Sequence, residues 1–105
     1  MAQFRIRALL YQAGDWWVAQ CLEYDLTTAS RQLEDLPAEL GRLLRVQIAA
    51  GLEAGLEPFE GLPQAPTRFW KQYEEALRRG AVPRRRFRVG AGLDVGATVK
   101  TLVAA

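Results

Sequence analysis

The sequence predicts an α+β fold in which an antiparallel sheet of three to five strands packs on a long amphipathic helix. Two patterns carry this prediction. From Gln3 to Cys21, apolar residues alternate with other residues on either side of a turn, as in paired strands. From Leu33 to Ile48, leucines recur at spacings of three and four, which is the pattern of one helix face. The expected order of elements is β-β-β-α, followed by a second, C-terminal helix and one or two closing strands.

The first expected strand runs from Gln3 to Tyr11 and has one apolar side. Arg5 and Arg7 alternate with the apolar residues Phe4, Ile6, Ala8 and Leu10. The segment 12–15 supplies a tight turn, in which Gly14 can take a positive φ, so the next strand should fold back antiparallel. A third extended segment is expected at about 26–31, where Thr27 and Thr28 are β-branched.

The strand after the turn offers apolar side chains on both of its faces. Trp16 and Val18 should point to one side of the sheet, and Trp17, Ala19 and Cys21 to the other. Such a strand needs cover above and below. The leucine helix is expected on one face, and the other face should be covered by the second helix or by another copy of the chain.

The rest of the chain is expected to form a connector, a second helix and the closing strands of a single domain spanning 1–105. Pro37 suits the first turn of the leucine helix, and Gly51 and Gly55 mark its exit, so the β-β-β-α unit spans 3–54. The segment 55–65 is rich in Pro and Gly and is expected to be pinned to the body by Leu56, Phe59 and Leu62. Within 66–105, Pro66 opens a helix whose apolar stripe is Phe69, Trp70, Tyr73, Ala76 and Leu77. The segments 83–89 and 98–103 are the candidate closing strands.

The composition excludes several classes of protein. A chain of 105 residues with 50% hydrophobic and 25% charged residues has the size and balance of one globular domain. One cysteine excludes an intrachain disulfide, and no apolar run is long enough for a signal peptide or a membrane span. We therefore expect a cytoplasmic protein with no membrane partner.

The residues W-V-A-Q-C-L-E-Y-D-L, followed by T-T-A-S-R-Q-L-E-D-L, resemble the N-terminal domain of the HicB-like antitoxins. The resemblance spans about residues 3–48. It implies a HicB-like sheet with the long helix on one face, and a bacterial protein that neutralises a small toxin ribonuclease by masking its active site. It therefore favours a protein-binding module that acts on a protein partner or on itself as a homo-oligomer. The expected partner-binding residues are Trp16, Trp17, Glu23, Tyr24 and Asp25.

The chemical inventory does not favour an enzyme, and we expect no cofactor and no metal. The chain has no histidine, which excludes a histidine base and imidazole metal ligands. Cys21 is expected to be a small buried hydrophobe rather than a nucleophile. Glu23 and Asp25 could face one side as a carboxylate pair, but a solvated or partner-facing acidic patch is the favoured interpretation.

A basic run near the C-terminus supports an alternative function. Arginine at the density of Arg84, Arg85, Arg86 and Arg88 suits phosphate contacts, and Phe87 could stack on a base, as in proteins that bind single-stranded nucleic acid. The favoured interpretation is a charged edge strand that discourages edge-to-edge pairing, because the net charge of the whole chain is only +2.

Overall fold

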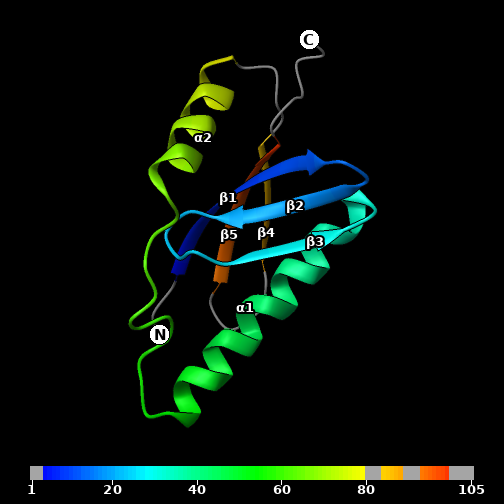
Figure 1. The fold of residues 1–105 in the computed structure, drawn as a ribbon. Helices are drawn as coiled ribbons and strands as arrows, with labels where there is room; N and C mark the ends of the chain where they lie inside the picture. The colour runs from blue at the N-terminus through cyan, green and yellow to red at the C-terminus, as the bar shows by residue number, and fades with distance from the viewer. Residues whose placement is uncertain (1–3, 80–83, 89–92, 100–105) are drawn as a thin grey trace.

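The computed structural model describes residues 4–79, 84–88 and 93–99, with side chains described for 5–79. In these residues the elements follow the expected order (Figure 1). They are β1 (Phe4–Ala13), β2 (Trp16–Cys21), β3 (Thr27–Ser30), the 3-10 turn η1 (Leu33–Asp35), α1 (Leu36–Glu53), α2 (Thr67–Arg79), β4 (Arg84–Arg88) and β5 (Leu93–Val99). The predicted α+β fold, with three antiparallel strands, a long helix and a second helix, is confirmed.

The strands form one sheet in the order β3-β2-β1-β5-β4. β1, β2 and β3 make an antiparallel meander, and β4 pairs antiparallel with β5. β5 lies beside β1 and runs parallel to it, with Ile6 opposite Val95. The complete sheet is therefore mixed, because a parallel neighbour joins the predicted antiparallel meander.

The closing strands differ from the expected positions. The basic segment forms edge strand β4, as expected, but strand β5 begins at Leu93, five residues before the expected start at Thr98. Gly96 lies inside β5 opposite Arg7. Glycine is disfavoured in strand interiors, so local propensity places this strand too late in the chain. Residues 100–103 lie outside the described residues.

The hairpin between β1 and β2 has the predicted two-residue turn. Gly14 has a φ of +60° and Ala13 pairs with Trp16, so Gly14 and Asp15 are the two turn residues. A positive φ at the first of them is what a type II′ turn requires, and its twist suits antiparallel strands. The turn fixes the register that sends Trp16 and Trp17 to opposite faces.

One face of the sheet packs on α1. Its buried core consists of side chains from β1, β2, α1 and the connector, namely Ile6, Ala8, Leu10, Ala19, Cys21, Leu36, Leu40, Leu44 and Phe59. Trp17 also packs against this core, so the expected position of the leucine helix on one face of the sheet is confirmed. The side chain of Phe4 lies outside the described residues. α1 ends two residues before Gly55, whose φ is +75°, while Gly51 lies within its last turn.

The connector is ordered by backbone bonds and one buried ring. The amide of Asp25 donates to the carbonyl oxygen of Pro63 (2.8 Å), and Ala65 N donates to Leu22 O (3.0 Å). Phe59 is buried and stacks on Tyr24, with 4.5 Å between ring centroids. Leu62 packs on the core as expected, but Leu56 is 41% exposed and does not pin the connector.

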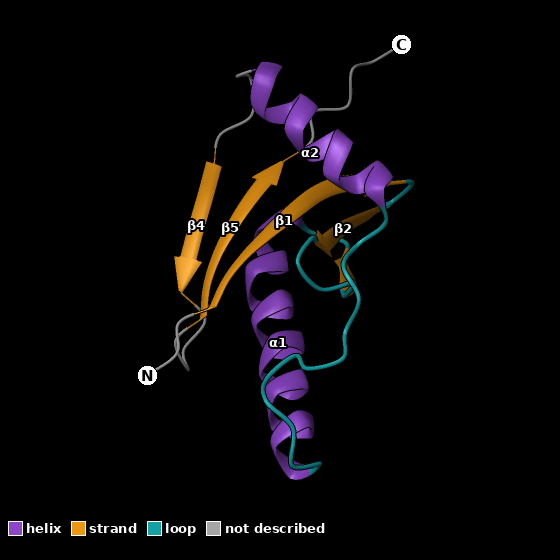
Figure 2. Ribbon diagram, turned by 90° about the vertical axis from the view of Figure 1, so that its left-hand side faces the viewer, coloured by secondary structure: helices purple, strands orange, loops and turns teal. Residues whose placement is uncertain are grey.

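α2 covers part of the second face of the sheet (Figure 2). Its residues join Leu9 and Leu22 in a second buried cluster, which also includes Ala65 and Tyr73. Around that cluster pack Tyr11, Phe69, Trp70 and Leu77. The prediction that the aromatic stripe of the second helix covers this face is therefore confirmed for the part of the face over β1 and β5. Within the described residues, neither helix has the length and apolar character of a membrane-crossing segment.

Candidate functional site

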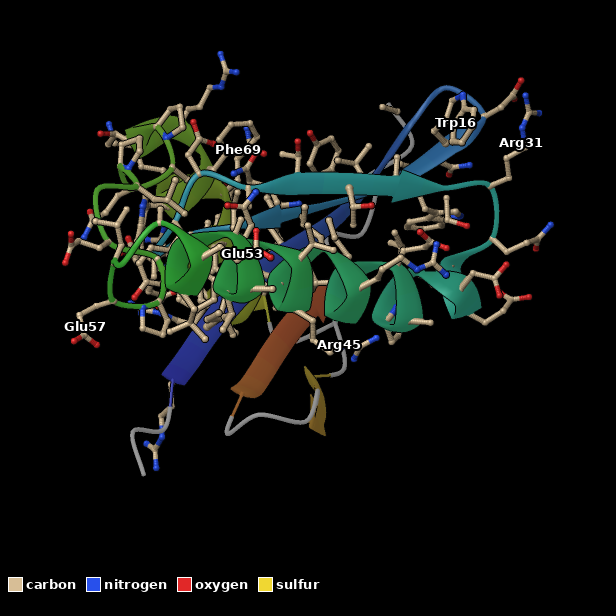
Figure 3. All side chains as sticks on the ribbon, turned by 90° about the horizontal axis from the view of Figure 1, so that it is seen from below. Trp16, Arg31, Arg45, Glu53, Glu57 and Phe69 are labelled. Atoms are coloured by element: carbon tan, nitrogen blue, oxygen red, sulfur yellow. The ribbon has the colours of Figure 1, made fainter. Side chains whose placement is uncertain are left out.

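Part of the second sheet face lies exposed. α2 lies over β1 and β5, while β2 and β3 form the opposite end of the sheet order. Alternation along the strands directs Tyr11, Trp16, Val18, Thr27 and Ala29 to this side, and we call these residues, with Arg31 beside β3, the open face. Of these, Trp16, Thr27, Ala29 and Arg31 are exposed, and Tyr11 and Val18 are half-buried. Trp16, Arg31 and Phe69 stand on the side of the strands opposite α1 (Figure 3).

Trp16 is the most prominent side chain of the open face. It is 45% exposed, although tryptophan is a residue whose large apolar area is usually buried. The guanidinium carbon of Arg31 lies 4.8 Å from the centre of its ring. At an exposed position such a cation–π contact contributes about 0.5–1 kcal/mol, which favours this orientation of the indole about two- to fivefold. The contact therefore biases the ring toward the position in which it is presented to solvent.

A second aromatic group borders the open face on the α2 side. Tyr11 stacks on Phe69 with ring centroids 6.2 Å apart, and the guanidinium of Arg68 lies 4.8 Å from the Phe69 ring centre. Among the described side chains, the ion pairs are Arg7–Glu23, Arg42–Glu39 and Arg79–Glu75. Arg31 and Arg68 therefore lie over aromatic rings and have no carboxylate partner in that part of the chain. The open face therefore has an arginine over an aromatic ring at each end, Arg31 over Trp16 and Arg68 over Phe69.

Glu23 forms an ion pair inside the chain. Its two carboxylate oxygens accept from Arg7, one from the backbone N–H at 2.7 Å and one from Nε at 2.6 Å. The same guanidinium lies 4.6 Å from the ring centre of Trp70, so the charge of Glu23 helps to hold α2 on the sheet. Half of the Arg7 side chain is exposed, and solvent screening keeps this contribution modest.

The other predicted partner-binding residues are distributed around β2. Trp17 lies on the α1 face, and Tyr24 packs on Phe59. Asp25 is exposed, and its Oδ1 accepts from Nε2 of the buried Gln20 at 2.9 Å. Glu23, Tyr24 and Asp25 follow the end of β2, whereas Trp16 begins it. The structure therefore does not bring the five residues together, and of the five only Trp16 belongs to the open face.

The sequence pattern did not predict that several of these residues lie on or beside the open face. Tyr11 is the last residue of the predicted first strand, and Arg31 lies beyond the observed end of β3. Only the β2–β3 register, in which Trp17 is opposite Ser30, brings Arg31 next to Trp16. Phe69 and Arg68 reach the open face because α2 packs there. The alternation of Trp16 and Val18 along their strand was the one sequence pattern that indicated this face.

The basic run lies at the other edge of the sheet. The backbone of residues 84–88 forms β4, which pairs with β5, with Arg86 opposite Gly96, and is the outermost strand at this end of the sheet within the described residues. The side chains of Arg84, Arg85, Arg86, Phe87 and Arg88 lie outside the described residues. The open face and β4 are therefore at opposite ends of the sheet.

Cys21 is fully buried in the α1 core. Burial, and to a lesser extent the negative charge of Glu23, raises the pKa of its thiol to about 12. A thiol with this pKa has almost no thiolate near neutral pH, so it is a poor nucleophile and metal ligand. No group of three acidic or cysteine side chains that could hold a metal ion occurs in the described part of the chain.

The chain was compared with protein-family models, with curated proteins and with solved structures, and none of them matches it.

Proposed function

We propose that this chain is a protein-binding module and that the open face is its binding surface. The observation that carries the proposal is the position of Trp16, which is 45% exposed and held by Arg31 on a sheet face that α2 covers only in part. Tryptophan, tyrosine and arginine are the residues that most often dominate the energy of protein interfaces. Here all three stand on one side of one sheet.

The contacts of the aromatic rings favour a protein partner over nucleic-acid bases on this face. Bases bind single-stranded-nucleic-acid proteins by stacking on free ring faces. One face of Trp16 is occupied by Arg31, and Phe69 already stacks on Tyr11 and contacts Arg68. A protein surface can pack on the edges of these rings and on the aliphatic parts of the arginines without displacing them.

The resemblance to the HicB-like antitoxins supports the proposal by suggesting a class of partner. It implies a bacterial, cytoplasmic protein whose partner is a small toxin ribonuclease. A second copy of the chain is the other protein that could cover the open face, and it would make the protein a homo-oligomer. Nucleic acid bound by Arg84–Arg88 remains the alternative function.

The test is affinity capture by the tagged full chain from a lysate of its own host. We expect a stoichiometric protein partner whose affinity falls at least about thirtyfold in the variant Trp16→Ser, the effect of losing an interface hot spot. Val46→Ser is the matched control, because Val46 is another exposed apolar side chain (57%) but lies on α1.

Three outcomes would contradict the proposal. Retention of the partner by Trp16→Ser would exclude the open face, and loss of the partner in Val46→Ser would move the surface to α1. Recovery of nucleic acid that is released by salt and lost when Arg85, Arg86 and Arg88 become Ser would instead support the nucleic-acid alternative. Sedimentation of the purified chain separates self-association from binding to another protein.

A further inference from the structure

The two edges of the sheet differ in how well they are protected against strand pairing. β4 carries four arginines in five residues, and charged edge strands discourage pairing with other chains. β3 has the sequence Thr-Thr-Ala-Ser, with no charge and no proline. In the described part of the chain it lies at the end of the sheet order, with β2 as its single neighbour. β3 is therefore the unprotected edge of the sheet, and it borders the open face.

The backbone groups that this edge presents can be identified. Cys21 N donates to Leu26 O at 2.9 Å, so Cys21 and Leu26 are a hydrogen-bonded pair. In an antiparallel ladder hydrogen-bonded pairs alternate with pairs that make no such bonds. Thr28 opposite Ala19, and Ser30 opposite Trp17, therefore bond to β2. The N–H and C=O groups of Thr27 and Ala29 point outward, and the side chains of these two residues lie on the open face.

The position of α1 determines which occupant fits this edge. α1 runs beneath β3 on the other face of the sheet (Figure 3). Adjacent strands are about 4.8 Å apart, whereas packed helices need about 8–10 Å between axes. A second copy paired through β3 would bring its own α1 too close to this one. An extended segment with no helix on that face avoids the clash.

The charge beside β3 determines the composition of that segment. Arg31 is exposed at the end of β3 and lies over Trp16 without a carboxylate partner among the described side chains. Opposite charges across neighbouring strands stabilise the pairing, and like charges destabilise it. Thr27 and Ala29 are small, so a larger apolar side chain opposite them has room to lie over Val18.

We infer that β3 is the docking edge for an extended, acidic segment of the partner protein, which adds to the sheet as a sixth strand and places an acidic and an apolar side chain on the open face. This inference rests on the proposed function and specifies its partner. Main-chain bonds to Thr27 and Ala29 supply affinity, and contacts with Arg31, Trp16 and Val18 supply selectivity.

The test selects short random peptides, displayed on phage, for binding to the full chain. The expected peptides carry an acidic residue two positions from an apolar one. When bound, they slow hydrogen exchange at the amides of Thr27 and Ala29. Ala29→Pro removes an outward N–H without removing a bond to β2, so we expect it to weaken the peptides at least about tenfold. Arg31→Glu should reverse the selection and favour basic peptides.

The inference is overturned if no peptide is selected, if the selected peptides are basic, or if they leave both amides unprotected. Ala29→Lys provides a second edge variant in case Ala29→Pro does not fold, and tight peptide binding by a folded edge variant also overturns the inference. If the partner protein is lost in Trp16→Ser but bound normally by Ala29→Pro and Ala29→Lys, that result supports the open face as the binding surface and contradicts strand addition at β3.

Discussion

Among the described residues, Cys21 is the one whose acid–base chemistry is changed most by burial. Its thiol lies in the α1 core, where burial, and then the charge of Glu23, raises its pKa from 9.0 to about 12. Between these two values the folded chain keeps the proton that the unfolded chain loses. The contribution of the Cys21 thiol to the free energy of unfolding is therefore fully present below about pH 9 and is lost as the pH rises toward 12.

We predict that the free energy of unfolding of the wild-type chain falls more steeply above pH 9 than that of Cys21→Ala, by at most about 1.4 kcal/mol per pH unit. Urea denaturation of both proteins from pH 7 to 11 measures the difference, because all other side chains are the same in the two proteins. Parallel curves would show that the thiol is not held protonated. In the native protein below pH 9, Cys21 should also resist alkylation until the chain unfolds.

The ion pair between Arg7 and Glu23 gives a second prediction at the scale of the residue. Glu23→Gln keeps the size of the side chain but removes the charge that binds both the guanidinium and the backbone amide of Arg7. We expect a loss of about 1 kcal/mol in the free energy of unfolding, because hydrogen bonds to a charged group contribute more to stability than an exposed ion pair does. Thermal or urea denaturation measures it.

Glu75→Gln is the matched control for that change. Glu75 pairs with Arg79 one helix turn away, and both side chains are 53% exposed. Such a pair contributes about 0.3–0.5 kcal/mol. If Glu23→Gln lowers the free energy of unfolding by no more than Glu75→Gln does, the contacts of Arg7 with Glu23 and Trp70 do not help to hold α2 on the sheet.

Sequence reasoning succeeded for residues whose environment depends on strand alternation. Trp16 and Trp17 were predicted on opposite faces and lie there, because the pleat leaves no other arrangement once the Gly14 turn is set. It did not foresee that Arg7 joins Glu23 to Trp70. Those residues come from three separate elements, and only packing brings them together. The same is true of the contact between Arg31 and Trp16.

At the scale of the element, the two glycines near the end of α1 have different roles. Gly55 has a φ of +75° just after the helix, where its amide donates to Leu52 O, and a side chain there would meet open space. Gly51 lies inside the helix, and a Cβ on it would lie 3.5 Å from Glu57 O, an ordinary contact. The sequence pattern marked both as exit residues, but only Gly55 needs the left-handed conformation.

We predict that Gly55→Ala lowers the free energy of unfolding by about 1 kcal/mol, because a side chain disfavours positive φ. Gly51→Ala should raise it by about 0.5–1 kcal/mol through better helix propensity. Urea denaturation of the pair tests both signs. A stabilising Gly55→Ala, or effects of equal sign, would contradict this description of the helix end.

At the scale of the whole molecule, the sheet is covered unequally. α1 covers one face of the meander, while α2 covers the second face only over β1 and β5. The order of the elements could be predicted from hydrophobic periodicity. The parallel pairing of β5 with β1 could not, because strand signals are local and carry no information on which distant strand becomes the neighbour. The extent of the open face depends on that pairing, since it sets where α2 packs.

The central claim is that the chain binds its partner through the open face, and site-specific photocrosslinking in the host cell tests it most directly. A photoreactive benzophenone amino acid would replace Thr27 in one version of the chain and Val46 in another, so that Trp16 stays in place. Thr27 is exposed on the open face, and Val46 is exposed on α1, which packs on the other face of the sheet. We predict a discrete protein adduct from position 27 and none from position 46. An adduct from position 46 alone, or none from either, would contradict the claim.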